Sequence, residues 1–206
     1  MNIFFMKNII LGCLLFLFSV VVFAQETVQN TTNANAEEVS YYEVGDVGFG
    51  GVIFYVDESG LHGLACTIAD QSKGAKWGNK DIVIKHERLS EDFNTTNAIF
   101  GETGKNKNTR AAYAAKICRK LKTKMDGTKY KDWRLPTIDE LAILYKNREL
   151  VNNTAKVYGG EAFVNTYYWS GSEFDYTRAW VYYFDTGQKS SHYKNYRYHV
   201  RAVREF

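Results

Sequence analysis

The sequence predicts an α+β domain in which two amphipathic helices accompany several short strands. A helix start is marked at Thr137, because a hydroxyl N-cap followed three residues later by Glu140 forms a capping box. A second stretch, residues 109–122, places apolar side chains at helical spacing with charges between them. Runs of aromatic and β-branched residues bounded by glycines, such as residues 52–56, are typical of strands.

The first 24 residues differ from the rest of the chain. Lys7 precedes an apolar run from residue 9 to residue 22, and the run is followed by Ala24 and a polar stretch. This order of a basic, an apolar and a small-residue segment predicts a secretory signal peptide over residues 1–24. A permanent transmembrane anchor is the alternative. We therefore expect a secreted, periplasmic or cell-surface protein.

After the leader, residues 25–40 are polar and lack periodicity, which predicts a flexible spacer. The remaining residues, 41–206, are enough for one domain with one good core. Near its start, residues 52–56 and 64–68 read as a hairpin closed by a Gly-containing turn. Residues 79–107 are polar with little periodicity, and we expect a long surface excursion there.

Two helices and three strands complete the prediction. In the helix at 109–122, one face carries apolar side chains, and Asp126-Gly127 forms a turn after it. The helix that starts at Thr137 is followed by a predicted loop with Asn152-Asn153 and Gly159-Gly160. Trp169 and Trp180 are predicted to anchor the core from within strands. The predicted strands are residues 167–170, 179–184 and 199–203.

Charge is unevenly distributed along the chain, although the net charge is only +3. Residues 37–102 carry 12 acidic and 5 basic side chains, whereas residues 105–148 carry 13 basic and 4 acidic ones. Such asymmetry indicates a dipolar surface. Lys116, Arg119 and Lys120 are either the solvated face of a helix or part of a basic patch for sulfated or carboxylated glycans, nucleic acid or anionic lipid. Export argues against nucleic acid.

Tyrosines are concentrated in the last third of the chain, among Ser, Asn and Lys residues. Tyr gives contact area at low entropic cost and Ser and Asn give adaptable hydrogen bonds, as in antibody paratopes. We expect ligand contacts in two loops, residues 172–178 and 187–198. The alternative is that half of the tyrosines pack in the sheets. The predicted contact residues are Tyr176, Tyr193, Asn195 and Tyr196, with a glycan or a protein as ligand.

Cys66 and Cys118 are the cysteines that follow the leader. An even pair in an exported protein more often forms a structural disulfide than a metal or redox site, so a Cys66–Cys118 bridge is predicted. Two buried free thiols remain the alternative. A nucleophilic role has no support, because no histidine can be placed near either residue from the sequence.

Catalytic and metal motifs are weak. The four histidines lack the HExxH or any comparable ligand spacing. Ser170-Gly171-Ser172 lacks the strand-to-helix context of a nucleophile elbow. Acidic neighbours such as Asp57 and Glu58 lie in turn-like segments. The sequence thus predicts no enzyme, no cofactor and no metal site.

Several motifs together resemble a known family. They are GGVIFYV, HGLACTIADQS, ICRKL, DWRLPTIDEL, YWSGSE, AWVYYFDTG and HVRAVREF. In this order they are similar to the C-terminal domain family of the bacterial collagen-like adhesin Lcl, over residues 45–206. The resemblance implies a C-type-lectin-like fold, shared with formylglycine-generating enzymes and the variable proteins of diversity-generating retroelements. It also implies two helices flanking small antiparallel sheets, paired N- and C-terminal strands, and extracellular binding rather than catalysis.

Departures from those relatives narrow the expected function. Calcium-dependent lectins place proline within a carboxylate or amide ligand motif, but the only proline here is Pro136, in Leu-Pro-Thr. A calcium site built from other ligands is the remaining alternative. Formylglycine-generating chemistry needs cysteines in the C-terminal half, and none follows Cys118. We therefore expect an exported, non-catalytic adhesion domain, with an enzyme of unidentified chemistry or a structural envelope module as alternatives.

Overall fold

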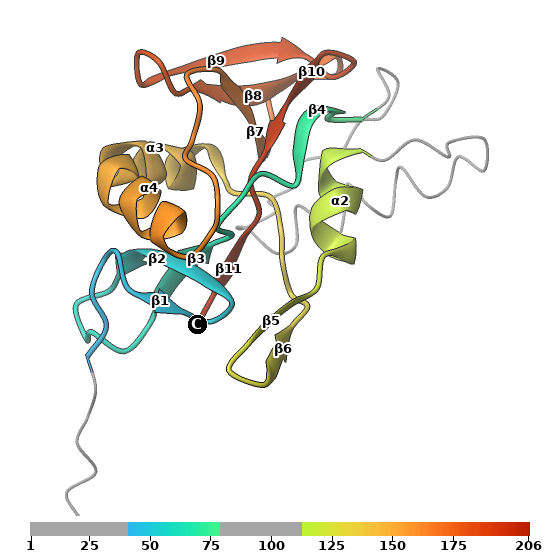
Figure 1. The fold of residues 1–206 in the computed structure, drawn as a ribbon. Coiled ribbons are helices and arrows are strands. Elements are labelled where there is room, and N and C mark those ends of the chain that lie inside the picture. The colour runs from blue at the N-terminus through green and yellow to red at the C-terminus, as the bar shows by residue number, and fades with distance from the viewer. Residues whose placement is uncertain (1–40, 79–112) are drawn as a thin grey trace, which may run out of the picture. The chain divides into compact units, whose positions relative to one another are not determined.

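The computed structural model describes residues 41–78 and 113–206, which all belong to the unit Ser40–Phe206 (Figure 1). The predicted signal peptide, spacer and surface excursion lie outside the described residues, as does the start of the predicted first helix. None of the helices in the described ranges is long and apolar enough to cross a membrane.

Two main sheets and a small ribbon carry the strands. The five-stranded sheet contains β4 (Ser72–Lys76), β10 (Arg197–Val200), β7 (Tyr167–Glu173), β8 (Arg178–Tyr183) and β9 (Gln188–Tyr193), in this order across the sheet. The four-stranded sheet has the order β1 (Val47–Gly48), β2 (Gly51–Val56), β3 (Gly63–Cys66) and β11 (Val203–Glu205). β5 (Thr123–Met125) and β6 (Thr128–Tyr130) form the ribbon.

Strand pairing is antiparallel except between β10 and β7, which run parallel. The predicted hairpin at the start of the domain is confirmed as β2 and β3, with the second strand ending at Cys66. The resemblance implied that the first and last strands pair. Instead, β11 pairs with β3, and β1 lies at the opposite edge of the same sheet.

The capping box at Thr137 is confirmed at the start of α3 (Ile138–Lys146). The Thr137 hydroxyl accepts from the Glu140 amide at 3.1 Å, and the Glu140 carboxylate accepts from the Thr137 amide at 2.8 Å. The same carboxylate receives two 2.7 Å hydrogen bonds from the buried guanidinium of Arg134. The helix start is therefore tied to the segment that precedes it, in which Arg134 forms an isolated bridge to Val203. α2 (Ala114–Lys120) lies within the other predicted helix.

A third helix, α4 (Arg148–Val157), lies where a loop was predicted, so the expectation of two helices is wrong. Val151 and Ala155, one turn apart, are buried, and α4 contacts β2. The Asn152 side chain accepts a 2.8 Å hydrogen bond from the Phe163 amide. Tertiary contacts on one face thus stabilise a helix whose Asn-Asn pair resembles a loop in sequence.

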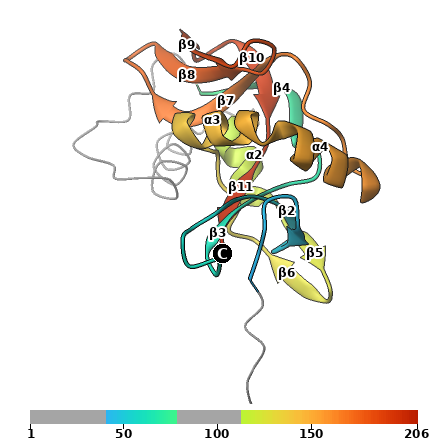
Figure 2. The ribbon, with the colours of Figure 1, turned by 90° about the vertical axis from the view of Figure 1, so that its left-hand side faces the viewer.

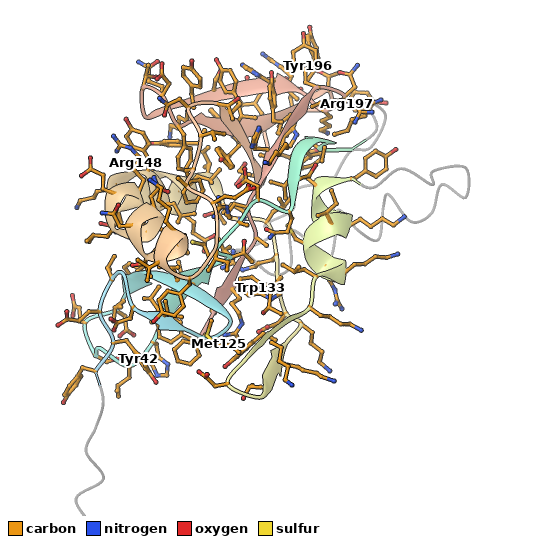
Figure 3. All side chains as sticks on the ribbon, in the orientation of Figure 1. Tyr42, Met125, Trp133, Arg148, Tyr196 and Arg197 are labelled. Carbon is orange, nitrogen blue, oxygen red and sulfur yellow. The ribbon has the colours of Figure 1, made fainter. Side chains whose placement is uncertain are left out.

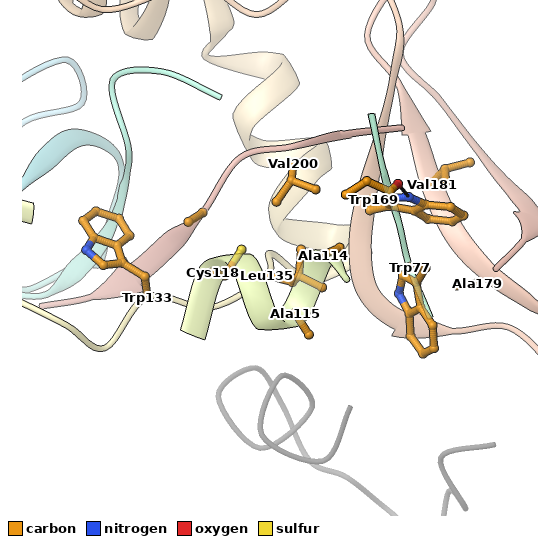
Figure 4. Close-up of a cluster of buried hydrophobic side chains, with 12 residues drawn as sticks. Trp77, Ala114, Ala115, Cys118, Trp133, Leu135, Trp169, Ala179, Val181 and Val200 are labelled. Atoms are coloured by element: carbon orange, nitrogen blue, oxygen red, sulfur yellow. Dashed lines mark hydrogen bonds between the residues drawn. The ribbon is translucent and has the colours of Figure 1, made fainter. Parts of the chain in front are cut away.

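Two hydrophobic clusters fill the domain. The first lies around α2, with Trp77 and Trp169 beside the five-stranded sheet and Trp133 at the other end of the helix (Figure 4). The Trp77 and Trp169 indoles donate to the backbone carbonyls of Ser170 and Ala75, at 2.8 and 2.9 Å. The second cluster joins the four-stranded sheet to α3, α4 and the other face of β7 and β8 (Figure 2). Trp169 is confirmed as a core anchor.

The predicted disulfide is wrong. Cys66 and Cys118 are free thiols, and both are fully buried. Cys66 packs in the second hydrophobic cluster and Cys118 in the first, so each side chain fills a different part of the core. Burial raises the pKa of Cys66 to about 12 and also raises the pKa of Cys118. Both therefore act as small apolar side chains, the alternative left open by the sequence.

Candidate functional site

One face of the five-stranded sheet collects aromatic side chains from four strands or their ends. Tyr167 on β7 lies directly opposite Tyr183 on β8, so the two side chains share a face. On β9, His192 lies opposite Ala179 of β8. Ala179 and Tyr183 are an even number of residues apart on β8, so their side chains project from one face. Because side chains alternate along a strand, His192 projects from that same face. We call Tyr167, Tyr183, His192, Tyr196 and Tyr198 the aromatic face.

The rings of the aromatic face are in contact. Tyr167 and Tyr183 stack with centroids 4.5 Å apart and an interplanar angle of 22°. Tyr167 also lies 4.6 Å from His192 and 5.1 Å from Tyr198. Tyr198 in turn packs on the buried Trp169 at 4.9 Å. The core therefore supports these half-buried rings from below, and ordering them for a ligand costs little further entropy.

A hydrogen bond joins two strands across this face. His192 Nδ1 lies 2.6 Å from the Tyr198 hydroxyl. Burial lowers the pKa of His192, so the ring is neutral at pH 7, and burial raises the pKa of Tyr198 to about 12. In the tautomer whose Nδ1 accepts a hydrogen bond from the Tyr198 hydroxyl, Nε2–H is a donor. The aromatic face thus offers hydrogen-bonding groups without a positive charge.

The tyrosines predicted as contacts lie at one tip of the sheet, next to the aromatic face. Tyr176 lies in the β7–β8 turn, and Tyr193, Asn195 and Tyr196 lie at the end of β9 and in the connection to β10. Tyr176, Tyr193 and Tyr196 are exposed to 55%, 51% and 47%. The Tyr196 ring lies 5.7 Å from Tyr193 and 6.2 Å from Tyr198, so the tip and the aromatic face form one surface. Figure 3 shows Tyr196 at the end of the five-stranded sheet, next to Arg197.

A buried lysine holds the tip together. Lys194 is fully buried, and its ammonium pairs with the Glu173 carboxylate at the end of β7. The same ammonium donates to the Tyr176 carbonyl at 2.9 Å and lies 5.0 Å from the Trp77 ring centroid. The Lys194 amide donates to the Thr177 carbonyl at 2.9 Å. The β7–β8 turn and the β9–β10 connection are thereby fixed to each other.

The predicted loop at residues 187–198 is mostly strand, which corrects the sequence analysis. β9 pairs all six of its residues with β8 without a break in register, and only residues 194–196 connect it to β10. Tyr168 and Tyr182 are buried in the second hydrophobic cluster. For these two tyrosines the alternative of core packing is confirmed.

The basic residues predicted as contacts all lie on one helix. Lys116, Arg119 and Lys120 belong to α2, which contacts β4. β4 and β9 are the opposite edges of the five-stranded sheet (Figure 1). Arg119 and Lys120 are exposed and Lys116 is half-buried. α2 shares a hydrophobic cluster with Trp169 and Val181, so it lies on the same side of the sheet as Tyr167 and Tyr183.

Trp180 departs from its predicted role as a core anchor, because it is only half-buried. Phe174 contacts its ring edge to face at 4.8 Å, and the Lys189 ammonium lies 5.7 Å above it. Lys189 lies opposite Tyr182 in the β8–β9 register, so it projects from the face opposite to the aromatic face. Lys189 and Trp180 thus cover the reverse side of this sheet edge.

The contacts of the half-buried His199 are structural. His199 Nδ1 lies 2.7 Å from Asp70 Oδ2, and Arg201 Nε donates to Asp70 Oδ1 at 2.7 Å. The Tyr168 hydroxyl donates to the same Asp70 Oδ2 at 3.1 Å. All of these groups join neighbouring segments of the two sheets. Within residues 41–78 and 113–206, no group of three or more His, Cys, Asp or Glu side chains is placed to hold a metal ion.

An open depression of about 390 Å³ lies away from the aromatic face, between the β2–β3 hairpin, α3 and β11. Tyr55, Asp57, Glu140 and Glu205 are among its lining residues. Glu140 and Glu205 both receive hydrogen bonds from Arg134, at 2.7 and 3.0 Å. Both carboxylates therefore form structural hydrogen bonds with Arg134.

Comparison with protein families gives a match to the Lcl C-terminal domain over residues 66–204. The chain belongs to this family. The Lcl C-terminal domain match runs from the end of β3 to β11, so it includes the aromatic face, the tip and Lys194. It confirms the family identified from the sequence motifs. No curated protein gives a significant match.

Proposed function

We propose that the chain is an exported, non-catalytic recognition domain that binds a surface glycan through the aromatic face and the adjoining tip. The observation that carries this proposal is the continuous surface from Tyr167 to Tyr193, whose tip is fixed by the buried Lys194–Glu173 pair. Aromatic rings with a polar edge combine apolar contact with hydrogen bonding, which suits the C–H faces and hydroxyls of a sugar.

Rigidity supports binding at this site. A flexible loop must be ordered when it binds, and this costs free energy for each immobilised side chain. Here the backbone of the tip is already held by Lys194, through the Tyr176 and Thr177 carbonyls. The exposed tyrosines can therefore contribute most of their contact energy to the ligand.

Membership of the Lcl C-terminal domain family supports a role in adhesion and a fold of the C-type-lectin-like kind. The predicted signal peptide adds export to this proposal. A protein ligand would use the same tyrosines, as antibody paratopes do. An enzyme of unidentified chemistry and a structural envelope module are the competing functions.

The test is binding of the purified protein to a broad glycan panel, with and without a calcium chelator. We expect binding to at least one glycan that survives chelation. The double variant Tyr193→Ala with Tyr196→Ala should weaken it while leaving thermal stability nearly unchanged. Tyr158→Ala is the matched control, because Tyr158 is exposed to 58% at the end of α4 and outside the proposed site.

Three results would contradict the proposal in different ways. Absence of binding to every glycan would favour a protein ligand or a structural role. Unfolding of the double variant would place these tyrosines in the core. Turnover of a bound glycan would point to an enzyme instead.

A further inference from the structure

We infer that the β5–β6 ribbon docks on an anionic phospholipid membrane through lysines on its outward face. The ribbon connects α2 to the segment that enters α3, and none of its residues belongs to the aromatic face or the tip (Figure 1). Its strands and the residues directly before and after them carry Lys122, Lys124, Lys129 and Lys131, which we call the lysine face. This inference goes beyond the proposed function and does not depend on it.

Strand register sets the two central lysines directly opposite each other. Lys124 on β5 pairs with Lys129 on β6, and the next pair towards the base of the ribbon is Thr123 with Tyr130. Because side chains alternate along a strand, the two lysines project from one face and Thr123 and Tyr130 from the other. The outer members of the lysine face flank the Thr123–Tyr130 pair in sequence and continue the alternation of the central lysines. Like charges placed directly opposite each other destabilise a ribbon, and an anion bound between them would relieve this repulsion.

The other face of the ribbon packs against the domain. The Trp133 indole donates to the Thr123 hydroxyl at 3.2 Å, and the Arg204 guanidinium lies 4.8 Å from the Tyr130 ring centroid. The β1–β2 turn approaches so closely that a Cβ added at Gly50 would lie 2.5 Å from Thr123 Oγ1 and 2.7 Å from Tyr130 Cδ2. Tyr130 is half-buried, whereas all members of the lysine face are exposed. The lysine face is therefore the solvent side of the ribbon.

The acidic residues next to the lysine face in sequence do not neutralise it. Both oxygens of Asp132 accept 2.9 Å hydrogen bonds from Arg204. Asp126 lies in the turn at the far end of the ribbon, between β5 and β6. Within the described ranges, neither carboxylate forms an ion pair with a lysine of this face. The ribbon thus presents a local excess of positive charge to solvent, which attracts anions.

The dimensions of the lysine face suit a flat partner that carries many negative groups. Cross-strand neighbours have Cβ atoms about 5 Å apart, and alternate residues of one strand are about 6.6 Å apart. The ammonium groups therefore form a compact patch rather than a line. A membrane with anionic headgroups presents phosphates over a whole surface and attracts such a patch. Because the face consists of lysines without an apolar side chain for insertion, the binding is peripheral and electrostatic.

The experiment is sedimentation of the full purified chain with vesicles of phosphatidylcholine alone or mixed with phosphatidylglycerol. We expect binding to the anionic vesicles that exceeds binding to the neutral ones and falls steeply between low and physiological salt. A lysine near an anionic membrane strengthens binding by about fivefold, so Lys124→Gln with Lys129→Gln should weaken it about twentyfold at low salt. The apolar leader is the same in every variant, so the difference between the two vesicle types reports the charge of the domain.

Matched variants control for charge and for folding. Lys124→Arg with Lys129→Arg keeps both charges and should retain binding. Lys146→Gln with Lys156→Gln changes the net charge equally at exposed positions of α3 and α4, and binding should change little. The glutamine pair on the ribbon should not lower the melting temperature, because it removes a repulsion. Tyr193→Ala with Tyr196→Ala should leave vesicle binding unchanged, so this test is independent of glycan binding.

Three results would overturn the inference. The first is equal binding to neutral and anionic vesicles. The second is loss of anionic binding in a Lys116→Gln, Arg119→Gln, Lys120→Gln variant but not in the ribbon variant, which would place the membrane contact on α2. The third is binding of heparin that depends on the lysine face without any binding to anionic vesicles, which would make the partner a linear polyanion.

Discussion

Replacing Lys194 by methionine tests whether the buried ion pair fixes the tip. Methionine has a similar length and no charge, so the substitution leaves the Glu173 carboxylate buried without the ammonium that now neutralises it. Removing one partner of a buried pair costs about 3–5 kcal/mol, because the remaining charge keeps its desolvation penalty. The 2.9 Å hydrogen bond to the Tyr176 carbonyl is lost as well.

Urea denaturation followed by circular dichroism measures this cost. We expect Lys194→Met to lower the free energy of unfolding by about 3 kcal/mol or more. The double variant Lys194→Met with Glu173→Gln should recover part of the loss, because the uncompensated carboxylate is gone. Lys189→Met is the matched control and should change stability by less than about 0.5 kcal/mol, since Lys189 is exposed.

The reasoning is refuted if Lys194→Met costs less than about 1 kcal/mol, the range of an exposed ion pair. It is also refuted if the double variant is less stable than the single variant. Glycan binding provides a second measurement at temperatures where the variant remains folded. A mobile tip should bind more weakly even when all the tyrosines are present.

Two further predictions concern the cysteines and His192. Because Cys66 and Cys118 are free and buried, a thiol reagent should modify neither of them in the folded protein and both after unfolding. A reducing agent should not change the melting temperature, and a protein mass about 2 Da lower without reductant would reveal a disulfide instead. Burial lowers the pKa of His192, so the unfolded chain binds a proton at this residue more readily than the folded protein does. The stability that neutral His192 contributes is therefore present above its ordinary pKa of 6.5 and is lost as the pH falls below that value. The difference in unfolding free energy between the protein and His192→Asn should therefore shrink as the pH falls from neutral towards 5; a constant difference would argue against the burial of this imidazole.

Local sequence signals predicted the parts of the fold that depend on neighbouring residues. The capping box needs only Thr137, Glu140 and the residues between them, so its three-residue spacing was sufficient. The hairpin of β2 and β3 was predicted for the same reason, because a glycine turn separates two apolar runs. Both elements are present in the structure, and the hairpin has a register shift between Ile53 and Tyr55.

Elements stabilised from a distance were missed. α4 carries Asn152 and Asn153, and its buried face depends on β2, a segment about a hundred residues earlier in the chain. β9 has the polar sequence QKSSHY, which lacks alternation because it is an edge strand whose order comes from pairing with β8. In both cases tertiary contacts outweigh a weak local preference.

The candidate site was predicted in composition but not in geometry. The abundance of tyrosine identified the C-terminal third, and Tyr193 and Tyr196 do lie together on an exposed surface. Which tyrosines face the core depends on strand register, so the roles of Tyr167, Tyr183 and His192 could not be read without it. The disulfide was inferred from a count of cysteines, and a count carries no information on distance.

The two main sheets are joined by two chain crossings that lie side by side. Residues 67–71 pass from β3 to β4, and Arg201 and Ala202 pass from β10 to β11. Backbone and side-chain hydrogen bonds link the crossings, among them Thr67 N to Ala202 O at 3.0 Å and the buried Arg201–Asp70 ion pair. The two sheets cannot separate without breaking these contacts between the crossings. A pulling force applied to the five-stranded sheet would therefore be distributed over both sheets, and the domain would resist it as one mechanical unit.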